Sequence, residues 1–304
     1  MLTDAQINEI LAENGEKVVR AFDQFLSELN QKDVEMTEPL LDAFRYTFRS
    51  GGKRIRPTLV LEACKAMGGD PEKAVWFALA VEMIHTYSLI HDDLPVMDND
   101  SMRRGQKANH IVFGEANALL AGDALLTEAF SVLTKGLDAG LSAGQVVMAT
   151  RILAAAAGFT GMVGGQVMDL RSEHKTIDVD ELFSISERKT GALILASIKL
   201  GLIASGTDLN EMAYEAFCKY GFDLGVIFQM VDDILDVVGD PQKLGKTTGK
   251  DFKAHKKSFM HFVSPEEGRD LVNKMTEEAC AYIEPYDKNS FFVSFAHYLE
   301  RRES

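Results

Sequence analysis

Two long segments that are apolar on almost every face constrain the fold of this chain most. Residues 74–90 and 213–238 contain few polar side chains, and each carries aspartates at or just past its end. A helix that is apolar all round lies inside a bundle and not on a surface. Period-two alternation is scarce elsewhere, and polar segments with Gly or Pro separate about ten or more stretches of helical periodicity. We therefore predict an all-α protein.

The chain shows no sign of division into halves. No Pro-rich or Ser-rich linker and no repeat of fixed period is found, so we expect a single domain over residues 1–304. The net charge of −14 argues against nucleic acid as a partner, because such binding needs a broad basic surface. No apolar run approaches the roughly 20 residues that span a bilayer, and the amino terminus carries no secretion signal. We expect a cytoplasmic protein without stable membrane insertion.

Aspartates gather at both apolar segments: Asp92, Asp93 and Asp98 follow the first, and Asp232, Asp233 and Asp236 lie within the second. Ionised carboxylates this close repel one another and are costly beside apolar neighbours unless a cation binds. Magnesium prefers oxygen ligands and is commonly held by one or two carboxylates plus substrate phosphates. Two facing clusters would hold a diphosphate between them. The alternative is that each cluster is a solvated helix end.

Basic side chains form three groups in this acidic chain. Residues 51–57, Gly-Gly-Lys-Arg-Ile-Arg-Pro, are a compact cationic segment in which Pro57 suits the first position of a helix. Arginine forks and a helix terminus together suit a phosphate. Arg103 and Arg104 follow Asp98 closely enough to reach a phosphate bound there. A lysine-rich stretch over residues 239–257 is typical of a lid over anions, with a solvated charge run as the alternative.

These motifs resemble those of the trans-isoprenyl diphosphate synthases, specifically the bacterial farnesyl diphosphate synthases or geranyltranstransferases. The resemblance runs through nearly the whole chain. It rests on Gly-Gly-Lys-Arg-Ile-Arg-Pro (51–57), His-Thr-Tyr-Ser-Leu-Ile-His-Asp-Asp-Leu-Pro-Val-Met-Asp (85–98), Arg-Arg-Gly (103–105), Phe-Gly-Glu-Ala-Asn-Ala-Leu-Leu-Ala-Gly-Asp (113–123), Gly-Gly-Gln-Val-Met-Asp (164–169), Lys-Thr-Gly (189–191) and Phe-Gln-Met-Val-Asp-Asp-Ile-Leu-Asp (228–236). It implies an isoprenoid synthase bundle around a central catalytic cavity, and a homodimer.

The resemblance also implies the roles of individual residues. Metal binding falls to Asp92, Asp98 and Asp232, supported by Asp93, Asp233 and Asp236, with about three Mg²⁺ ions per site once substrate is bound. Isopentenyl diphosphate is expected at Lys53, Arg56, His85 and Arg104, and the allylic diphosphate at Arg103, Lys189, Lys246 and Lys256. Thr190 and Gln229 are expected to line the reacting carbons.

The implied reaction is ionisation of an allylic diphosphate, attack by isopentenyl diphosphate on the cation, and loss of a proton, without a side-chain nucleophile. Tyr87, with Ser88 beside it, is the expected floor of the cavity and would stop the product at the farnesyl length, unless it is only a core aromatic. A geranylgeranyl (longer-chain) synthase shares every motif except this floor. A non-catalytic helical subunit would not need two intact aspartate motifs, and a terpene cyclase would not need the Lys53/Arg56/His85 pocket.

Overall fold

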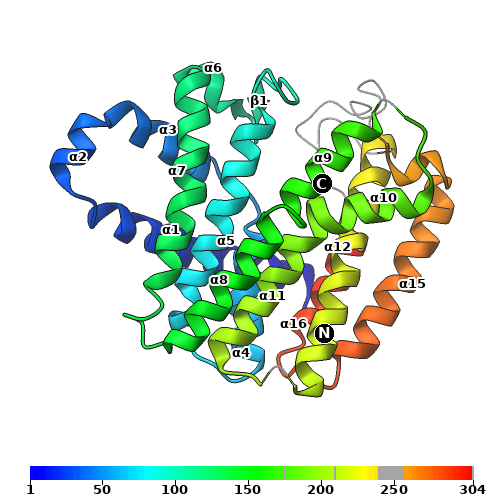
Figure 1. The fold of residues 1–304 in the computed structure, drawn as a ribbon. Helices are drawn as coiled ribbons and strands as arrows, with labels where there is room; N and C mark the ends of the chain where they lie inside the picture. The colour runs from blue at the N-terminus through cyan, green and yellow to red at the C-terminus, as the bar shows by residue number, and fades with distance from the viewer. Residues whose placement is uncertain (174, 209, 239–256, 303–304) are drawn as a thin grey trace.

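The computed structural model describes residues 1–173, 175–208, 210–238 and 257–302, and α-helices make up almost all of its regular structure (Figure 1). The predicted all-α class is confirmed. Two residues of the expected site, Lys246 and Lys256, lie outside the described residues, so their roles stay predictions.

The first half of the chain supplies seven α-helices and the small hairpin. They are α1 (Asp4–Ser27), α2 (Gln31–Met36), α3 (Glu38–Arg49), α4 (Ile55–Ala66), α5 (Pro71–Asp92), β1 (Met102–Arg103), β2 (Gln106–Lys107), α6 (Asn109–Phe113) and α7 (Glu115–Thr134). The described part of the second half supplies α8 (Ala143–Ala157), α9 (Met162–Ser172), α10 (Val179–Ser186), the π-helical turn η1 (Glu187–Gly191), α11 (Ala192–Ser205), α12 (Met212–Val238), the 3₁₀ turn η2 (Phe259–His261), α15 (Pro265–Ile283) and α16 (Phe291–Glu300).

Several helices begin where side chains satisfy their first backbone N–H groups. Helix α8 begins after Ser142, whose hydroxyl accepts from the Gln145 N–H while the Gln145 side chain accepts from the Ser142 N–H. Ser264 and Glu267 form the same reciprocal pair at α15. Each such cap contributes about 1 kcal/mol to helix stability.

The two apolar segments are the buried helices that their composition predicts. Helix α5 is packed between α4, α7, α11 and α1, and Phe77 and Leu79 on it have no exposed surface. Helix α12 packs against α11 and α15, and its Tyr220 is fully buried while its hydroxyl donates to the Phe292 carbonyl at 2.7 Å. Both helices run to the same end of the bundle, the upper end in Figure 1. The aspartates that end or follow them are therefore carried to one end of the molecule.

Three local details differ from the sequence prediction. Pro57 is the third residue of α4, which begins at Ile55, and not the first. Residues 33–39, one of the polar segments with Gly or Pro that separate the predicted helical stretches, contain most of α2 and the start of α3. A hairpin links β1 and β2 through Arg104 and Gly105, both at positive φ (52° and 76°). That conformation suits a two-residue hairpin turn, but strands of two residues leave no alternating pattern to detect.

Two helical stretches among the described residues are long and apolar enough to cross a membrane by length and composition alone. They are Glu115–Thr134 and Ala143–Ser172, of whose most apolar stretches 39% and 33% are buried. Both contain charged side chains, such as Asp123 and Arg151, so neither is an uninterrupted apolar run. Their exposed apolar residues lie on the outside of the bundle.

Candidate active site

The first aspartate motif folds back on itself directly after α5. The helix ends at Asp92, and the Asp98 N–H donates to the Asp92 carbonyl at 2.8 Å. This bond brings the two residues together although six positions separate them. Both are half-buried, whereas Asp93 is 1% exposed. The turn through Pro95 therefore places Asp92 and Asp98 where a ligand could reach them.

The buried Asp93 is bound to the hairpin. Arg103 Nε donates to Asp93 Oδ1 at 2.9 Å, and a second guanidinium nitrogen, Nη2, also donates to that oxygen. Burial raises the pKa of Asp93, and the hydrogen bond and charge of Arg103 act against that rise. Asp93 therefore fixes Arg103 beside the motif, and its expected support of the metal ligands stays a prediction.

The second aspartate motif is tied into a row of hydrogen bonds that crosses three elements. Thr190 Oγ1 donates to Gln229 Oε1 at 2.9 Å, and Gln229 Nε2 donates to Asp233 Oδ1 at 2.8 Å. The other Asp233 oxygen accepts from the Phe259 N–H at 2.7 Å. Thr190 and Gln229, which lie 39 positions apart, are thus in direct contact, and their role beside the reacting carbons stays a prediction. Asp236, one turn on, is 8% exposed.

A turn of π-helix carries Lys189 and Thr190. Helix α9 approaches the turn η1 closely at Gly165. A Cβ at this position would lie 2.4 Å from the Lys189 backbone nitrogen, so only glycine leaves enough space. Lys189 Nζ donates to Asp169 Oδ2 at 2.6 Å. Extra residues in a helical turn of this kind are frequent at functional sites. Asp169 belongs to a motif noted in the sequence, but its pairing with Lys189 was not foreseen.

Arg302 is a residue of the site that sequence reasoning missed. Its Nη2 donates to Asp232 Oδ1, and its guanidinium carbon lies 4.6 Å from the centre of the Phe228 ring. The Arg302 side chain is 7% exposed and that of Asp232 is 37% exposed. Burial lowers the pKa of Arg302 to about 10. No local sequence signal links positions 232 and 302, which are 70 residues apart.

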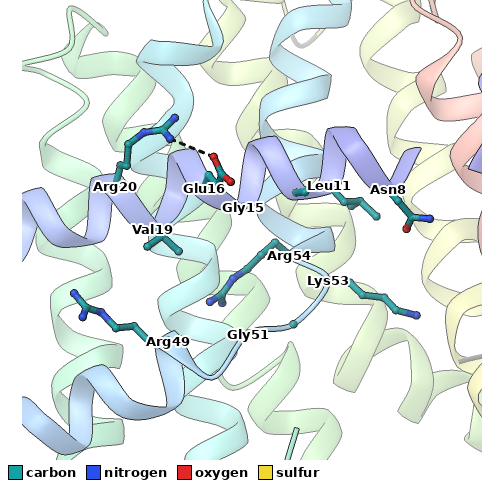
Figure 2. A pocket seen from close by; sticks show the side chains of 12 residues that line it. Asn8, Leu11, Gly15, Glu16, Val19, Arg20, Arg49, Gly51, Lys53 and Arg54 are labelled. Atoms are coloured by element: carbon teal, nitrogen blue, oxygen red, sulfur yellow. Dashed lines mark ion pairs between the residues drawn. The ribbon is translucent and has the colours of Figure 1, made fainter. Parts of the chain in front are cut away.

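Within the basic segment 51–57, the Arg54 side chain is buried and the Lys53 side chain is exposed. Arg54, at φ 49°, is buried, and its guanidinium donates to the buried Glu82 and to the Phe48 carbonyl. Figure 2 shows the Arg54 and Lys53 side chains pointing in different directions from the loop. The segment is therefore not a freely solvated turn, since Arg54 fixes it to α5.

Arg104 packs against this segment from the hairpin. Its Nη1 donates to the Gly51 carbonyl, and a Cβ at Gly52 (φ 113°) would lie 2.6 Å from the Arg104 guanidinium carbon. Only glycine provides both this backbone angle and this space. Nearby, the Arg56 Nε is buried without a hydrogen-bond partner among the described residues. A buried, unpaired guanidinium N–H is suited to an anionic ligand.

Charge and burial also act on His85 and Lys53. Burial, with the charges of Arg56 and Arg104, lowers the pKa of His85 well below its ordinary value, so its imidazole is neutral at pH 7. Burial of its ammonium, with the charge of Arg302, lowers the pKa of Lys53 to about 8, although part of the residue is exposed. Crowded positive charge of this kind is relieved when a phosphate binds.

The basic groups connect the two aspartate motifs. On one side, Arg103 binds Asp93 while Arg104, its neighbour, contacts Gly51. On the other side, Arg302 binds Asp232 and lies close enough to Lys53 to shift its pKa. Direct contacts therefore link the first motif to the basic segment, and a charge interaction between Lys53 and Arg302 links that segment to the second motif.

A cavity of about 540 Å³ lies on another side of the same segment, between α1 and residues 49–54 (Figure 2). Two of its cationic side chains are already paired with carboxylates, because Arg49 pairs with Asp23 at 2.5 Å and Arg20 lies 3.6 Å from Glu16. Neither aspartate motif contributes to its lining. It is a less suitable place for a diphosphate than the region between the motifs.

The donor set of the motifs suits a hard divalent cation that arrives with its substrate. Within the described ranges, no group of three His, Cys, Asp or Glu side chains forms a ready-made metal cluster. Magnesium does not require one, since it commonly takes one or two carboxylates and completes its shell with water and phosphate oxygens. Asp92, Asp98 and Asp232, which are half-buried, have the right chemistry.

The expected cavity floor lies one helical turn or so before Asp92. Tyr87 is 5% exposed and meets the His91 ring edge-to-face at 5.6 Å between centroids. Burial, with the charge of Asp92, raises the pKa of Tyr87 to about 12. His91 in turn fits against Gly122 on α7, where a Cβ would lie 2.1 Å from its Nε2. Ser88 is half-buried, and its hydroxyl donates to the His85 carbonyl at 2.9 Å.

Comparison with known proteins agrees with these motifs. Residues 37–284 match the family model described as polyprenyl synthetase. The chain is 42% identical over 273 residues to a farnesyl diphosphate synthase of Micrococcus luteus, covering 87% of this chain and 92% of that protein. It is 41% identical over 270 residues to a geranylgeranyl diphosphate synthase of Cyanophora paradoxa, covering 87% and 88%.

A solved structure shares the fold as well. The geranyltransferase of Helicobacter pylori, complexed with magnesium and isoprenyl diphosphate, is 32% identical and superposes with a TM-score of 0.79 over 96% of each chain. The helical bundle is thus the isoprenoid synthase fold that the sequence motifs implied. The family match covers most of the chain, and the relatives are matched over most of their own length. The chain therefore belongs to the polyprenyl synthetase family of prenyl-transferring enzymes.

Proposed function

We propose that this chain is a farnesyl diphosphate synthase that joins dimethylallyl or geranyl diphosphate to isopentenyl diphosphate with the help of Mg²⁺. The observation that carries the proposal is the series of cationic groups between two half-buried aspartate motifs. Neither feature alone requires two substrates. Together they provide a metal-assisted site for the diphosphate that leaves and a cationic site for the diphosphate that stays.

Asp92, Asp98 and Asp232 are the carboxylates that would hold the metal, with Asp93, Asp233 and Asp236 supporting them. When bound, Mg²⁺ supplies positive charge to the departing diphosphate, and the relative from Helicobacter pylori carries magnesium with its ligand. About three ions per site are proposed by analogy with the family. The half-buried carboxylates of this chain provide the oxygen donors that such ions prefer.

The cationic side chains separate into two sets. Lys53 and Arg56 of the basic segment, with His85 and Arg104 near it, are proposed to hold isopentenyl diphosphate. The neutral His85 can donate one hydrogen bond without adding to the crowded positive charge. Arg103 and Lys189, with Lys246 and Lys256 beyond the described residues, are proposed to hold the allylic diphosphate.

The reaction needs polar groups that face a cation and no nucleophilic side chain. The allylic C–O bond breaks with its electron pair leaving on the diphosphate, and the double bond of isopentenyl diphosphate attacks the resulting cation. A proton is then lost to the released diphosphate. Thr190 and Gln229 hold each other in place, so their oxygens form a fixed dipole beside the reacting carbons. Such preorganised dipoles stabilise developing positive charge more than water does.

The farnesyl product is proposed from Tyr87, which is buried, aromatic and closely packed against His91. The alternative is geranylgeranyl diphosphate, because relatives that carry either name are similarly close to this chain. The two functions share the site described above and differ only in how much chain the cavity admits below it.

A second copy of the chain is the proposed partner, with each copy a single domain in the cytoplasm. Apolar side chains gather on the outside of α6 to α9, where Leu120, Val147 and Val167 are each at least half exposed and Phe159 is 93% exposed. A surface patch of this kind is unusual in a monomer and marks an interaction site. Pairing of this face with itself would bury it without a membrane.

A product assay tests the proposed function. Purified protein is incubated with Mg²⁺, isopentenyl diphosphate and either dimethylallyl or geranyl diphosphate, and the products are separated by chromatography after removal of the phosphates. The expected product is farnesol from both starters, and none when Mg²⁺ is chelated. Geranylgeraniol as the main product would favour the alternative, and no product under any condition would overturn both.

A further inference from the structure

We propose that Arg302 occupies the second aspartate motif in place of a metal ion, so that Mg²⁺ can bind Asp232 only when this arginine leaves. The inference rests on the proposed function, because it takes Asp232 as a metal ligand. It adds a competitor that belongs to the chain itself. Asp232 can then bind either Mg²⁺ or Arg302, but not both at once.

The ion pair between Arg302 and Asp232 is built into the protein and is not a chance surface contact. The Arg302 side chain is 7% exposed, and its guanidinium carbon also lies 4.6 Å above the Phe228 ring. The neighbouring Arg301 gives a contrast, because it pairs with Asp4 at 2.8 Å while both side chains remain 54% exposed. Of two adjacent arginines, one is seated at the site and the other lies on the surface.

Competition follows from the oxygen that each cation needs. The Arg302 guanidinium takes Asp232 Oδ1, and the next carboxylate cannot replace it, since both Asp233 oxygens accept hydrogen bonds from Gln229 and Phe259. Magnesium binds oxygen directly at about 2.0–2.1 Å, which leaves no room for a guanidinium on the same lone pair. Two cations on one carboxylate would also repel each other.

The hydrogen bonding of Arg302 is incomplete, so a metal ion can displace this side chain from Asp232. Its Nε is buried and has no hydrogen-bond partner among the described residues. Lys53 lies close enough for the two positive charges to disfavour each other. An arginine with an unsatisfied N–H and a cationic neighbour is held less firmly than a fully paired one. A divalent ion can therefore compete with Arg302 for Asp232.

The test measures metal binding and not turnover. Coupling between two ligands for one site is reciprocal, so removing Arg302 should tighten metal binding by the factor that its pairing costs. We expect Arg302→Gln, in the full chain without substrate, to bind Mn²⁺ roughly tenfold more tightly by electron paramagnetic resonance of the free ion. Mg²⁺ alone should likewise raise the thermal midpoint at about tenfold lower concentration than in the parent protein.

Three further variants make the result interpretable. Arg301→Gln removes an adjacent arginine that does not touch Asp232 and should leave metal affinity unchanged. Arg302→Lys keeps the charge and should give an intermediate affinity. In the Asp232→Asn background, Arg302→Gln should no longer tighten binding, because the contested carboxylate is gone. Circular dichroism checks that each variant is folded, and Arg302→Ala serves if the glutamine variant is not.

The outcomes separate the inference from the function beneath it. Unchanged or weaker metal binding in Arg302→Gln, with binding reduced in Asp232→Asn, would overturn the competition and leave the metal site intact. Metal binding that is insensitive to Asp232→Asn and to Asp92→Asn would instead remove the metal from these motifs, and the proposed function would fail with it.

Discussion

The two aspartate motifs differ in how the protein balances their charge. At the first motif the counterion is local, because Arg103 follows Asp93 by ten residues and is delivered by a tight hairpin. At the second motif the counterion is distant in sequence, because Arg302 comes from beyond α16. The first cation binds the buried supporting carboxylate, whereas the second binds the half-exposed Asp232. The same sequence pattern therefore gives one motif in which an arginine binds a supporting carboxylate and one in which an arginine binds a proposed metal ligand.

This difference shows that an aspartate-rich motif has two separate parts. Some of its carboxylates are structural, as Asp93 and Asp233 are in both motifs, and they accept hydrogen bonds from the protein. Others, such as Asp92, Asp98 and Asp232, are half-buried and can be reached by a ligand. Sequence spacing identifies the group as a whole, and only the contacts separate its members.

The largest effect expected is loss of turnover when either motif loses a metal ligand. Asp92→Asn and Asp232→Asn should each lower kcat by about 10³-fold, since a metal ion contributes several kcal/mol to stabilising a leaving group. Steady-state rates with geranyl and isopentenyl diphosphates measure this. Asp23→Asn, which alters only a surface pair with Arg49, is the control. A decrease in kcat of less than tenfold for only one of the two variants would mean that the two motifs do not both bind the catalytic metal.

The supporting carboxylates should differ in stability, which sharpens the comparison. Asp93→Asn removes the buried carboxylate partner of Arg103, which keeps only the longer pair with Asp100 at 3.8 Å, and should cost about 3 kcal/mol in the free energy of unfolding. Asp233→Asn loses bonds to a neutral amide and a backbone N–H and should cost about 1 kcal/mol. Urea unfolding measures both. Equal costs would show that the counterion at the first motif is not what holds it together.

A pH profile tests the cationic connection between the motifs. The pKa of Lys53 is about 8, so its ammonium is charged below that pH and loses its proton above it. We expect kcat/KM for isopentenyl diphosphate to be level up to about pH 8 and then to fall by up to tenfold per pH unit. Lys53→Arg keeps its charge at higher pH and should shift this fall upward. An unshifted profile would assign the fall to another group.

The smallest effect on rate should come from Tyr87 and Ile227, which lie about one helical turn before the first and the second motif. Only substitution of Tyr87 should change the product. Tyr87→Ala opens the proposed floor and should give products longer than farnesyl, with rates changed only about threefold. Ile227, fully buried at the matching position before Asp232, provides the control, and Ile227→Val should cost about 1 kcal/mol of stability without altering the product. Chromatography of the dephosphorylated products decides. An unchanged product would leave Tyr87 as a core residue only.

The sequence predicted those parts of the molecule that depend on local patterns. The all-round apolar character of residues 74–90 and 213–238 predicted buried helices, and motif resemblance pointed to Thr190 and Gln229 as residues of one site, which their hydrogen bond brings together. The inward turn of Arg54 was not predictable, because it depends on Glu82 being buried on a neighbouring helix. The seating of Arg302 depends on packing across 70 residues. Long-range pairing leaves no periodic signal for a single sequence to show.

The π-helical turn η1 has a consequence for how this protein is aligned with others. A turn of this type holds about one residue more than the α-helical turn it replaces, so it can appear or vanish by insertion or deletion of one residue while the flanking helices keep their course. In this chain, such a change would shift residues inside the turn, Lys189 and Thr190 among them, by roughly 100° around the helix axis relative to the flanking helices. A one-residue gap between positions 187 and 191 is therefore a change of binding architecture, and treating it as ordinary length variation would pair side chains that do not correspond.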